Sequence, residues 1–171
     1  MKRQTAGITL VAGLFLAGCV DVNWGHRETV RGSGQIVEES RQVSGFDRVS
    51  VGGSGHLEIV QGEKESLTIE ADDNLLPYLE SEVVGGHLKI RPRRGVDLRP
   101  SRTIKYRLAL RDLNELRLSG SLHAESEFLE TDRLDLGISG SGRISVGSLR
   151  TQSLSMHISG SGRCDVAGRA P

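Results

Sequence analysis

Apolar and polar side chains alternate along most of the chain after residue 45. Leu57 and Ile59 flank the polar Glu58, and the same two-residue period returns at residues 67–69, 88–90 and 106–110. A period of two places one set of side chains on a buried face and the other in solvent, which indicates half-buried β-strands. The pattern therefore predicts an all-β fold.

Two local signals interrupt this pattern between residues 65 and 110. Gly85-Gly86 separates two alternating runs and predicts a hairpin turn. Residues 73–79 carry a helical signal, in which Asp73 or Asn74 would cap a short helix and Pro77 would limit its length. We expect residues 65–110 to form hairpins that pack beside the rest of the fold.

The second half of the chain repeats with a period of 20 residues. Residues 138–143 read Ile-Ser-Gly-Ser-Gly-Arg, residues 158–163 repeat this motif, and residues 118–121 hold a shorter copy. Coils of fixed length stack on one another and bury a common aliphatic core. The repeat predicts a β-solenoid, similar to a single-stranded β-helix, with coils of about 20 residues and adjoining hairpins.

Gly-Ser-Gly steps mark the expected corners of the coils. The step occurs at residues 32–34 and 53–55, and again at 140–142 and 160–162. Glycine adopts backbone angles that a Cβ opposes, which suits it to corners. We expect a structural turn role for six glycines: Gly53, Gly55, Gly140, Gly142, Gly160 and Gly162.

The start of the chain has the features of an export signal. Lys2 and Arg3 precede a mostly apolar run at residues 6–17, which is too short for a membrane span of roughly 20 residues. The following Leu-Ala-Gly-Cys resembles a bacterial lipobox, which implies that Cys19 is the acylated first residue of the mature protein. An ordinary secretory signal in which the cysteine occurs by chance, or a buried N-terminal strand, is the alternative. The resemblance also implies the outer membrane, because Val20 stands at the position after the cysteine where an Asp would favour inner-membrane retention in enteric bacteria.

These signals divide the chain into three parts. Residues 1–18 form a lipoprotein signal peptide, residues 19–31 a tether and residues 32–171 the solenoid domain. The chain carries 22 basic and 22 acidic residues without a basic block, so it lacks the electrostatic footprint of a nucleic-acid-binding protein.

Cys164 is the second of two cysteines. Steps of one and two repeats place it level with Ile144 and Ala124, so we expect an inward position in which it behaves as a small hydrophobe. A reactive thiol or an intermolecular bridge is the alternative.

Several motifs occur in a characteristic order along the chain. They are Gly-Ser-Gly at residues 32–34, Arg-Gln-Val-Ser-Gly-Phe-Asp-Arg-Val at 41–49, Gly-Ser-Gly with Leu-Glu-Ile at 53–59, and Glu-Ala-Asp-Asp-Asn-Leu-Leu at 70–76. With the later repeats, they resemble the auto-transporter adhesin head domain family, also called the GIN domain, over residues 32–168. The resemblance implies a solenoid-like all-β fold on exported or lipid-anchored bacterial proteins. It brings no established catalytic residues.

Candidate catalytic and metal-binding residues follow no familiar spacing. Ser141 lacks the flanking glycine and the following helix of a nucleophile elbow. The histidines match no metal motif, and we expect them to be scattered on the surface: His26, His56, His87, His123 and His157. The sequence therefore predicts no catalytic residue, no metal site and no cofactor.

Two short polar clusters leave alternatives open. Asp72 and Asp73 with Asn74 could bind calcium, but a helix cap or turn is favoured because the ligand ladder of a calcium loop is missing. The second cluster could contact acidic polysaccharide or lipid head groups, or could simply be a solvated hairpin end; it consists of Arg91, Arg93 and Arg94.

These observations predict a non-catalytic, lipid-anchored protein of the cell envelope. It would act in surface display, adhesion or envelope scaffolding through a repetitive polar β-face. Its expected partners are membrane lipid through acylated Cys19, an envelope protein or polysaccharide, and a second copy at the open coil ends, but not nucleic acid. A polysaccharide-binding or polysaccharide-cleaving β-helix protein is the alternative.

Overall fold

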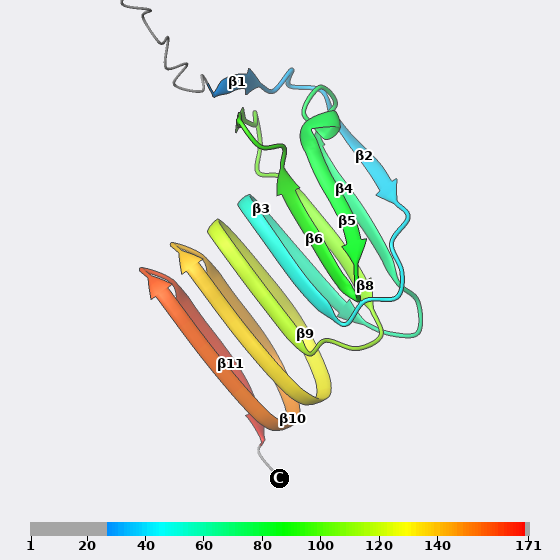
Figure 1. Cartoon of the computed structure of the whole chain (residues 1–171), viewed down its shortest axis with the longest axis vertical. Helices are drawn as coiled ribbons and strands as arrows, with labels where there is room; N and C mark the ends of the chain where they lie inside the picture. Colours follow the sequence, from blue (N-terminus) through cyan, green and yellow to red (C-terminus); the bar gives the residue numbers. More distant parts are fainter. Residues whose placement is uncertain (1–26, 170–171) are drawn as a thin grey trace, which may run out of the picture.

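The structure, a computed structural model, describes residues 27–169, which are mostly β-strand (Figure 1). The elements are β1 (Glu28–Arg31), β2 (Ile36–Arg41), β3 (Arg48–Gln61), β4 (Ser66–Asp72), the 3-10 helix η1 (Leu76–Tyr78), β5 (Leu79–Val84), β6 (His87–Pro92), β7 (Val96–Arg99), β8 (Lys105–Leu110), β9 (Glu115–Gly140), β10 (Arg143–Gly160) and β11 (Arg163–Arg169). The all-β prediction is confirmed. In this part of the chain, no helix has the length and apolar character to cross a membrane. The expected signal peptide and Cys19 lie outside the described residues.

Within residues 27–169, nine strands form one mixed sheet that does not close. Its main path runs β11-β10-β9-β3-β8-β4-β2, with β5 and β6 as a branch beside β3, and β1 pairs with β7 in a separate sheet. The strands from β11 to β8 pair in parallel, whereas β8-β4-β2 and β5-β6 pair antiparallel. The predicted β-solenoid with coils of about 20 residues is not shown, because the strands form one open mixed sheet in which those of residues 66–110 pair antiparallel with one another.

Residues 20 apart do pair in parallel at the C-terminal side of the sheet, where β9, β10 and β11 lie side by side (Figure 1). Ile144 on β10 lies in register with Ala124 on β9 and with Cys164 on β11. Cys164 is partly buried and packs against the hydrophobic core, and this burial raises the pKa of its thiol. The predicted inward column of small and aliphatic side chains is confirmed.

The branch of the sheet is a hairpin, as the Gly85-Gly86 signal predicts. β5 and β6 pair antiparallel up to Val84 and His87, and both turn glycines have positive φ, at 57° and 77°. These angles suit a two-residue turn whose twist matches that of the strands. β6 then pairs in parallel with the start of β3, which places the hairpin against the main sheet.

The helical signal at residues 73–79 produces only η1, and its predicted cap is wrong. Leu75 is the residue before η1 and makes no side-chain capping bond. Asp73 and Asn74 instead bind the segment before β2: the Ser33 hydroxyl donates to Asp73 at 2.5 Å, and the Ser33 amide donates to the Asn74 side chain at 2.9 Å. Asp73 and Asn74, the two candidate cap residues, therefore bond to a distant segment instead of capping η1.

The six glycines with expected turn roles differ in backbone conformation. Positive φ angles occur at Gly53 (101°), Gly55 (149°), Gly140 (116°) and Gly160 (113°). Gly142 and Gly162 have no positive φ, but a Cβ on Gly142 would lie 3.0 Å from the Leu122 carbonyl oxygen. Close approach of neighbouring strands, and not the backbone angle, is what favours glycine at those two positions.

Candidate functional site

A groove of about 660 Å³ is lined by the β5–β6 hairpin on one side and by β3, β9 and β10 on the other. The hairpin and the turn after it contribute Glu82, Lys89, Arg91 and Arg94. The main sheet contributes two more basic side chains and a row of small residues: Arg117, His157, Gly52, Ser119, Ser139 and Ser159.

Parallel pairing explains why these side chains meet. Ser50 on β3 lies in register with Lys89 on β6 on one side and with Arg117 on β9 on the other. Gly137 lies against Arg117, and its partner on β10 is His157. Alternate residues of a strand point to the same face, so the paired positions two residues further along these strands line the groove as well. At these positions Gly52 on β3 pairs with Ser119 on β9, and Ser139 on β9 pairs with Ser159 on β10.

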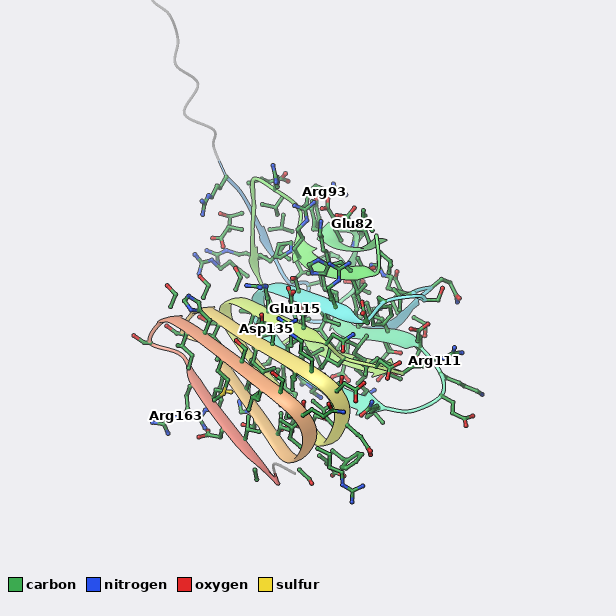
Figure 2. All side chains as sticks on the ribbon, turned by 60° about the horizontal axis from the view of Figure 1, so that its bottom comes forward. Glu82, Arg93, Arg111, Glu115, Asp135 and Arg163 are labelled. Atoms are coloured by element: carbon green, nitrogen blue, oxygen red, sulfur yellow. The ribbon has the colours of Figure 1, made fainter. Side chains whose placement is uncertain are left out.

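The basic side chains of the groove differ in whether they are paired. Arg117 forms ion pairs with Glu115 at 2.5 Å and Asp135 at 3.9 Å, and the hydrogen bond to Glu115 raises the pKa of Arg117. Figure 2 labels the two carboxylates, Glu115 and Asp135, on the main sheet. Arg91 forms ion pairs through its Nη2 atom, which lies 3.4 Å from Glu80 Oε2 and 3.8 Å from Glu82 Oε1.

Lys89 and Arg94 make no salt bridge within the described chain. Lys89 is half-buried and Arg94 is exposed. They are the cations of the groove that remain free to meet an anionic ligand.

The basic cluster of residues 91–94 is divided by the structure. Arg91 and Arg94 line the groove, whereas Arg93 donates a hydrogen bond to the Pro77 carbonyl at 3.0 Å. The Arg93 guanidinium also lies 5.3 Å from the ring centre of Tyr78, within cation–π range. Arg93 therefore holds the hairpin against η1 and is not part of the groove.

Comparison with known proteins identifies the family. The model of the family described as "Putative auto-transporter adhesin, head GIN domain" matches residues 45–171. The chain belongs to this family. The resemblance found in the sequence motifs is thus confirmed, and no curated protein is significantly similar to this GIN domain chain.

Two solved structures from Parabacteroides distasonis ATCC 8503 resemble this GIN domain. One, described as a "Putative lipid binding protein", is 28% identical with a TM-score of 0.76, over 82% of this chain and 63% of that one. The other, described as a "putative adhesin", is 21% identical with a TM-score of 0.64, over 84% of this chain and 70% of that one. The chain thus spans less than two thirds of the first structure, and the second shows a shared fold alone.

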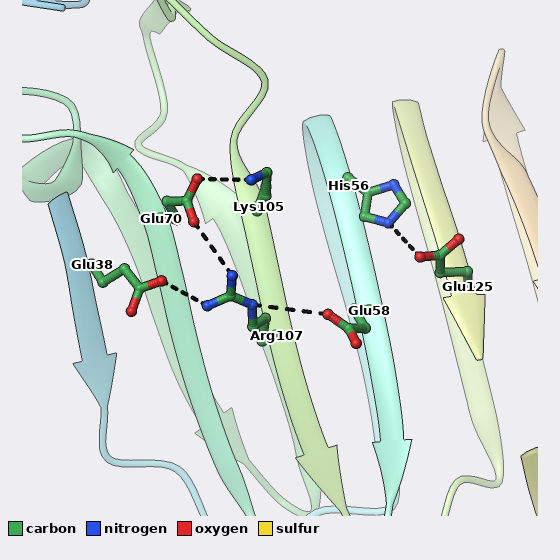
Figure 3. Close-up of polar contacts among 7 residues, drawn as sticks. All are labelled: Glu38, His56, Glu58, Glu70, Lys105, Arg107 and Glu125. Atoms are coloured by element: carbon green, nitrogen blue, oxygen red, sulfur yellow. Dashed lines mark hydrogen bonds and ion pairs between the residues drawn. The ribbon is translucent and has the colours of Figure 1, made fainter. Parts of the chain in front are cut away.

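The outer charged face of the GIN domain sheet is joined by ion pairs among its own members, Glu38, Glu58, Glu70, Lys105 and Arg107 (Figure 3). Arg107 bonds Glu38 at 2.6 Å and lies 3.5 Å from Glu70, and Lys105 lies 2.9 Å from Glu70. The hydrogen bond from Lys105 lowers the pKa of Glu70, and the one to Glu38 raises the pKa of Arg107. Because its charges are already paired, this face offers less to an ionic ligand than the groove does.

The histidines are not all scattered, contrary to the prediction. His87 hydrogen bonds the Ser50 hydroxyl at 2.7 Å, and its burial lowers its pKa. His56 and His123 occupy paired positions on β3 and β9, next to Glu125. No local signal in the sequence marks this cluster, because its members come from strands that the fold alone brings together.

Proposed function

We propose that this chain is a non-catalytic, lipid-anchored envelope protein that binds acidic polysaccharide through the groove beside the β5–β6 hairpin. The observation that carries the proposal is the placement of two unpaired cations, Lys89 and Arg94, along a row of serines. Membership of an adhesin family supports a role at the surface or in the envelope.

The groove has the chemistry that an acidic sugar needs. Its volume of about 660 Å³ is within the range of ligand pockets. A guanidinium recognises a carboxylate or sulfate by paired hydrogen bonds, and an ammonium adds a point charge. The hydroxyls of Ser119, Ser139 and Ser159 can both donate to and accept from sugar hydroxyls.

A binding role fits this groove better than cleavage of the polysaccharide. Glycoside hydrolysis generally uses a pair of carboxyl groups that flank the scissile bond. Glu82 is the single carboxylate among the described lining residues, and it lies beside Arg91.

Anchoring through Cys19 is part of the proposal. Several acyl chains on one residue hold a protein stably on a membrane, and a tethered array of copies would bind a polymer with high effective concentration. Cys19→Ala should move the protein from the membrane fraction to the soluble fraction. Unchanged membrane association of this variant would contradict the anchor.

The groove is tested by binding of the protein to immobilised polygalacturonate at low salt. We expect the double variant Lys89→Gln/Arg94→Gln to bind about tenfold more weakly, because each ion pair at a solvent-accessible position contributes up to about 1 kcal/mol and tenfold corresponds to about 1.4 kcal/mol. Lys64→Gln/Arg133→Gln removes the same charge from exposed positions outside the groove lining and should bind like the wild type. Equal weakening by both pairs would mean a general charge effect and would contradict the groove.

An anionic lipid head group is a second candidate ligand. It is favoured by the 28% identical structure that is described as a lipid-binding protein. Sedimentation with phosphatidylglycerol vesicles, against phosphatidylcholine vesicles as control, separates the two candidates. Groove-dependent binding to the anionic vesicles without binding to polygalacturonate would favour the lipid.

A further inference from the structure

His56, His123 and Glu125 form a cluster on the outer side of the sheet, away from the residues that line the groove. One ligand atom from each side chain lies within 4.8 Å of the others. His56 Nε2 lies 2.8 Å from Glu125 Oε1 (Figure 3). The ring centres of His56 and His123 are 5.2 Å apart. Both histidines are half-buried, and Glu125 is exposed.

The sheet itself holds these three side chains in place. His56 on β3 and His123 on β9 are paired positions of a parallel ladder that continues through Leu57 and Ala124 to Glu58 and Glu125. Because alternate residues share a face, Glu125 lies on the same face as the two imidazoles, one step further along the strand. Leu57 follows His56 and Ala124 follows His123. Both residues are buried and hold the two strands against the core. A site on paired strands of this kind is more rigid than a site on loops.

Two imidazoles and a carboxylate are a ligand set that Zn²⁺ and similar divalent ions favour. With bonds of about 2.0–2.2 Å, tetrahedral ligand atoms lie roughly 3.4 Å apart, so small side-chain rotations would bring this cluster to a metal. Binding would replace the present His56–Glu125 hydrogen bond by two metal bonds. Three protein ligands leave a fourth position open to water or to a group from outside.

The charges around the cluster are mixed, and carboxylates lie on its open side. Lys105 and Arg143 occupy the ladder positions beside His56 and His123, and Lys105 is already paired with Glu70 at 2.9 Å. A hollow of about 540 Å³ adjoins the cluster and is lined by Glu58, Glu125 and Glu127. Glu58 lies 3.9 Å from Arg107, but Glu125 and Glu127 make no salt bridge to a lysine or arginine within the described residues. The negative charge of these two carboxylates favours a cation at the open side of the cluster.

We propose that His56, His123 and Glu125 bind one divalent transition-metal ion of the Zn²⁺ class. The site is independent of the basic groove and of any ligand bound there.

The test is a titration of the full, untagged chain in detergent with Co²⁺, followed by displacement with Zn²⁺. Co²⁺ reports its ligands through visible absorption bands, and we expect one saturable site that Zn²⁺ competes for. His56→Gln and His123→Gln should each weaken binding by at least tenfold, because loss of a direct ligand costs at least as much affinity as loss of the groups that orient a ligand, which costs about 10–100-fold.

Matched controls separate this cluster from other metal-binding groups in the chain. His87→Gln, His157→Gln, His26→Gln and Cys164→Ser should leave the affinity unchanged, and circular dichroism should show that every variant is folded. No saturable Co²⁺ uptake by the wild type would overturn the proposal. So would equal affinity in the folded double variant His56→Gln/His123→Gln.

Discussion

At the scale of single residues, Asp72 shows how a buried charge is retained in this fold. The residue has 0% exposure and lies at the end of β4. Its carboxylate accepts hydrogen bonds from the Gly34 amide at 2.8 Å, the Ser101 amide at 2.9 Å and the Ser101 hydroxyl at 2.5 Å. Burial by itself would raise the pKa of Asp72, but these bonds outweigh it and lower the pKa below its usual range. The carboxylate thereby ties two separate loops to the sheet.

Asp72→Ala should lower the free energy of unfolding by about 2–4 kcal/mol at pH 7, because it removes the three hydrogen bonds that Gly34 and Ser101 donate to a charged carboxylate. The lowered pKa means that this stabilisation is fully present above the pKa of the unfolded chain and is lost as the pH falls through the folded-state value. Urea unfolding of both proteins from neutral to acid pH measures the difference. It should be largest at neutral pH and shrink in acid, whereas Asp112→Ala, at an exposed position, should change little.

At the scale of elements, the end of β9 shows why the repeat places glycine at its corners. Gly140 has φ 116°, and a Cβ built on it would lie 2.7 Å from the Gly120 carbonyl oxygen, one repeat earlier. Gly160 repeats this arrangement against the Gly140 carbonyl oxygen at 2.6 Å. Each corner is thus shaped by the one before it, and both the angle and the close approach require the absence of a side chain.

Gly140→Ala should lower the free energy of unfolding by about 2–4 kcal/mol, through backbone strain and a steric clash with the neighbouring corner. Thermal and urea unfolding would measure this loss. Gly62→Ala is the matched control, because Gly62 has no positive φ and a Cβ added there would meet no atom of the described chain within 4 Å. A loss as small for Gly140→Ala as for the control would mean that the corners adjust freely.

At the scale of the whole molecule, position along the stack decides how deeply each equivalent side chain is buried. Leu134, Leu136 and Ile138 on β9 are at most 2% exposed. Their partners one repeat later on β10 are 38–54% exposed, at Leu154, Met156 and Ile158. Side chains at equivalent repeat positions are therefore buried on β9 and exposed on this part of β10, because no further strand of the described chain packs over them there. Association with a second copy at this end stays a prediction, which concentration-dependent size in solution would test.

Leu134→Ala should lower the free energy of unfolding by about 2–4 kcal/mol, because it leaves a cavity in a fully buried site. Leu154→Ala removes the same atoms from the partner position and should cost less than about 1 kcal/mol, because that side chain is already partly in water. Equilibrium urea unfolding of the two variants measures this difference. Similar losses would mean that another surface covers Leu154 in solution.

The sequence by itself determined the strands, the hairpin and the repeat columns. Alternation of apolar and polar residues, the Gly85-Gly86 turn and the 20-residue period depend on neighbours in the chain, so their physics is local. The same reasoning placed Cys164 in the column of Ile144 and Ala124, as the parallel register confirms. It did not predict the hydrogen-bond partner of Asp73 and Asn74, because that partner, Ser33, belongs to a loop that is distant in sequence.

Only the tertiary structure decided which polar residues meet. Lys89 and Arg117 share a groove because β3 pairs with β6 and with β9 over the same residues, and no local pattern specifies that arrangement. His56 and Glu125 are 69 residues apart and come into contact through the same ladder. The pairing of distant strands is selected by burial of their apolar faces. Pairing of the strands also fixes which polar residues on their opposite faces become neighbours. Those neighbours can therefore be identified only once the fold is known.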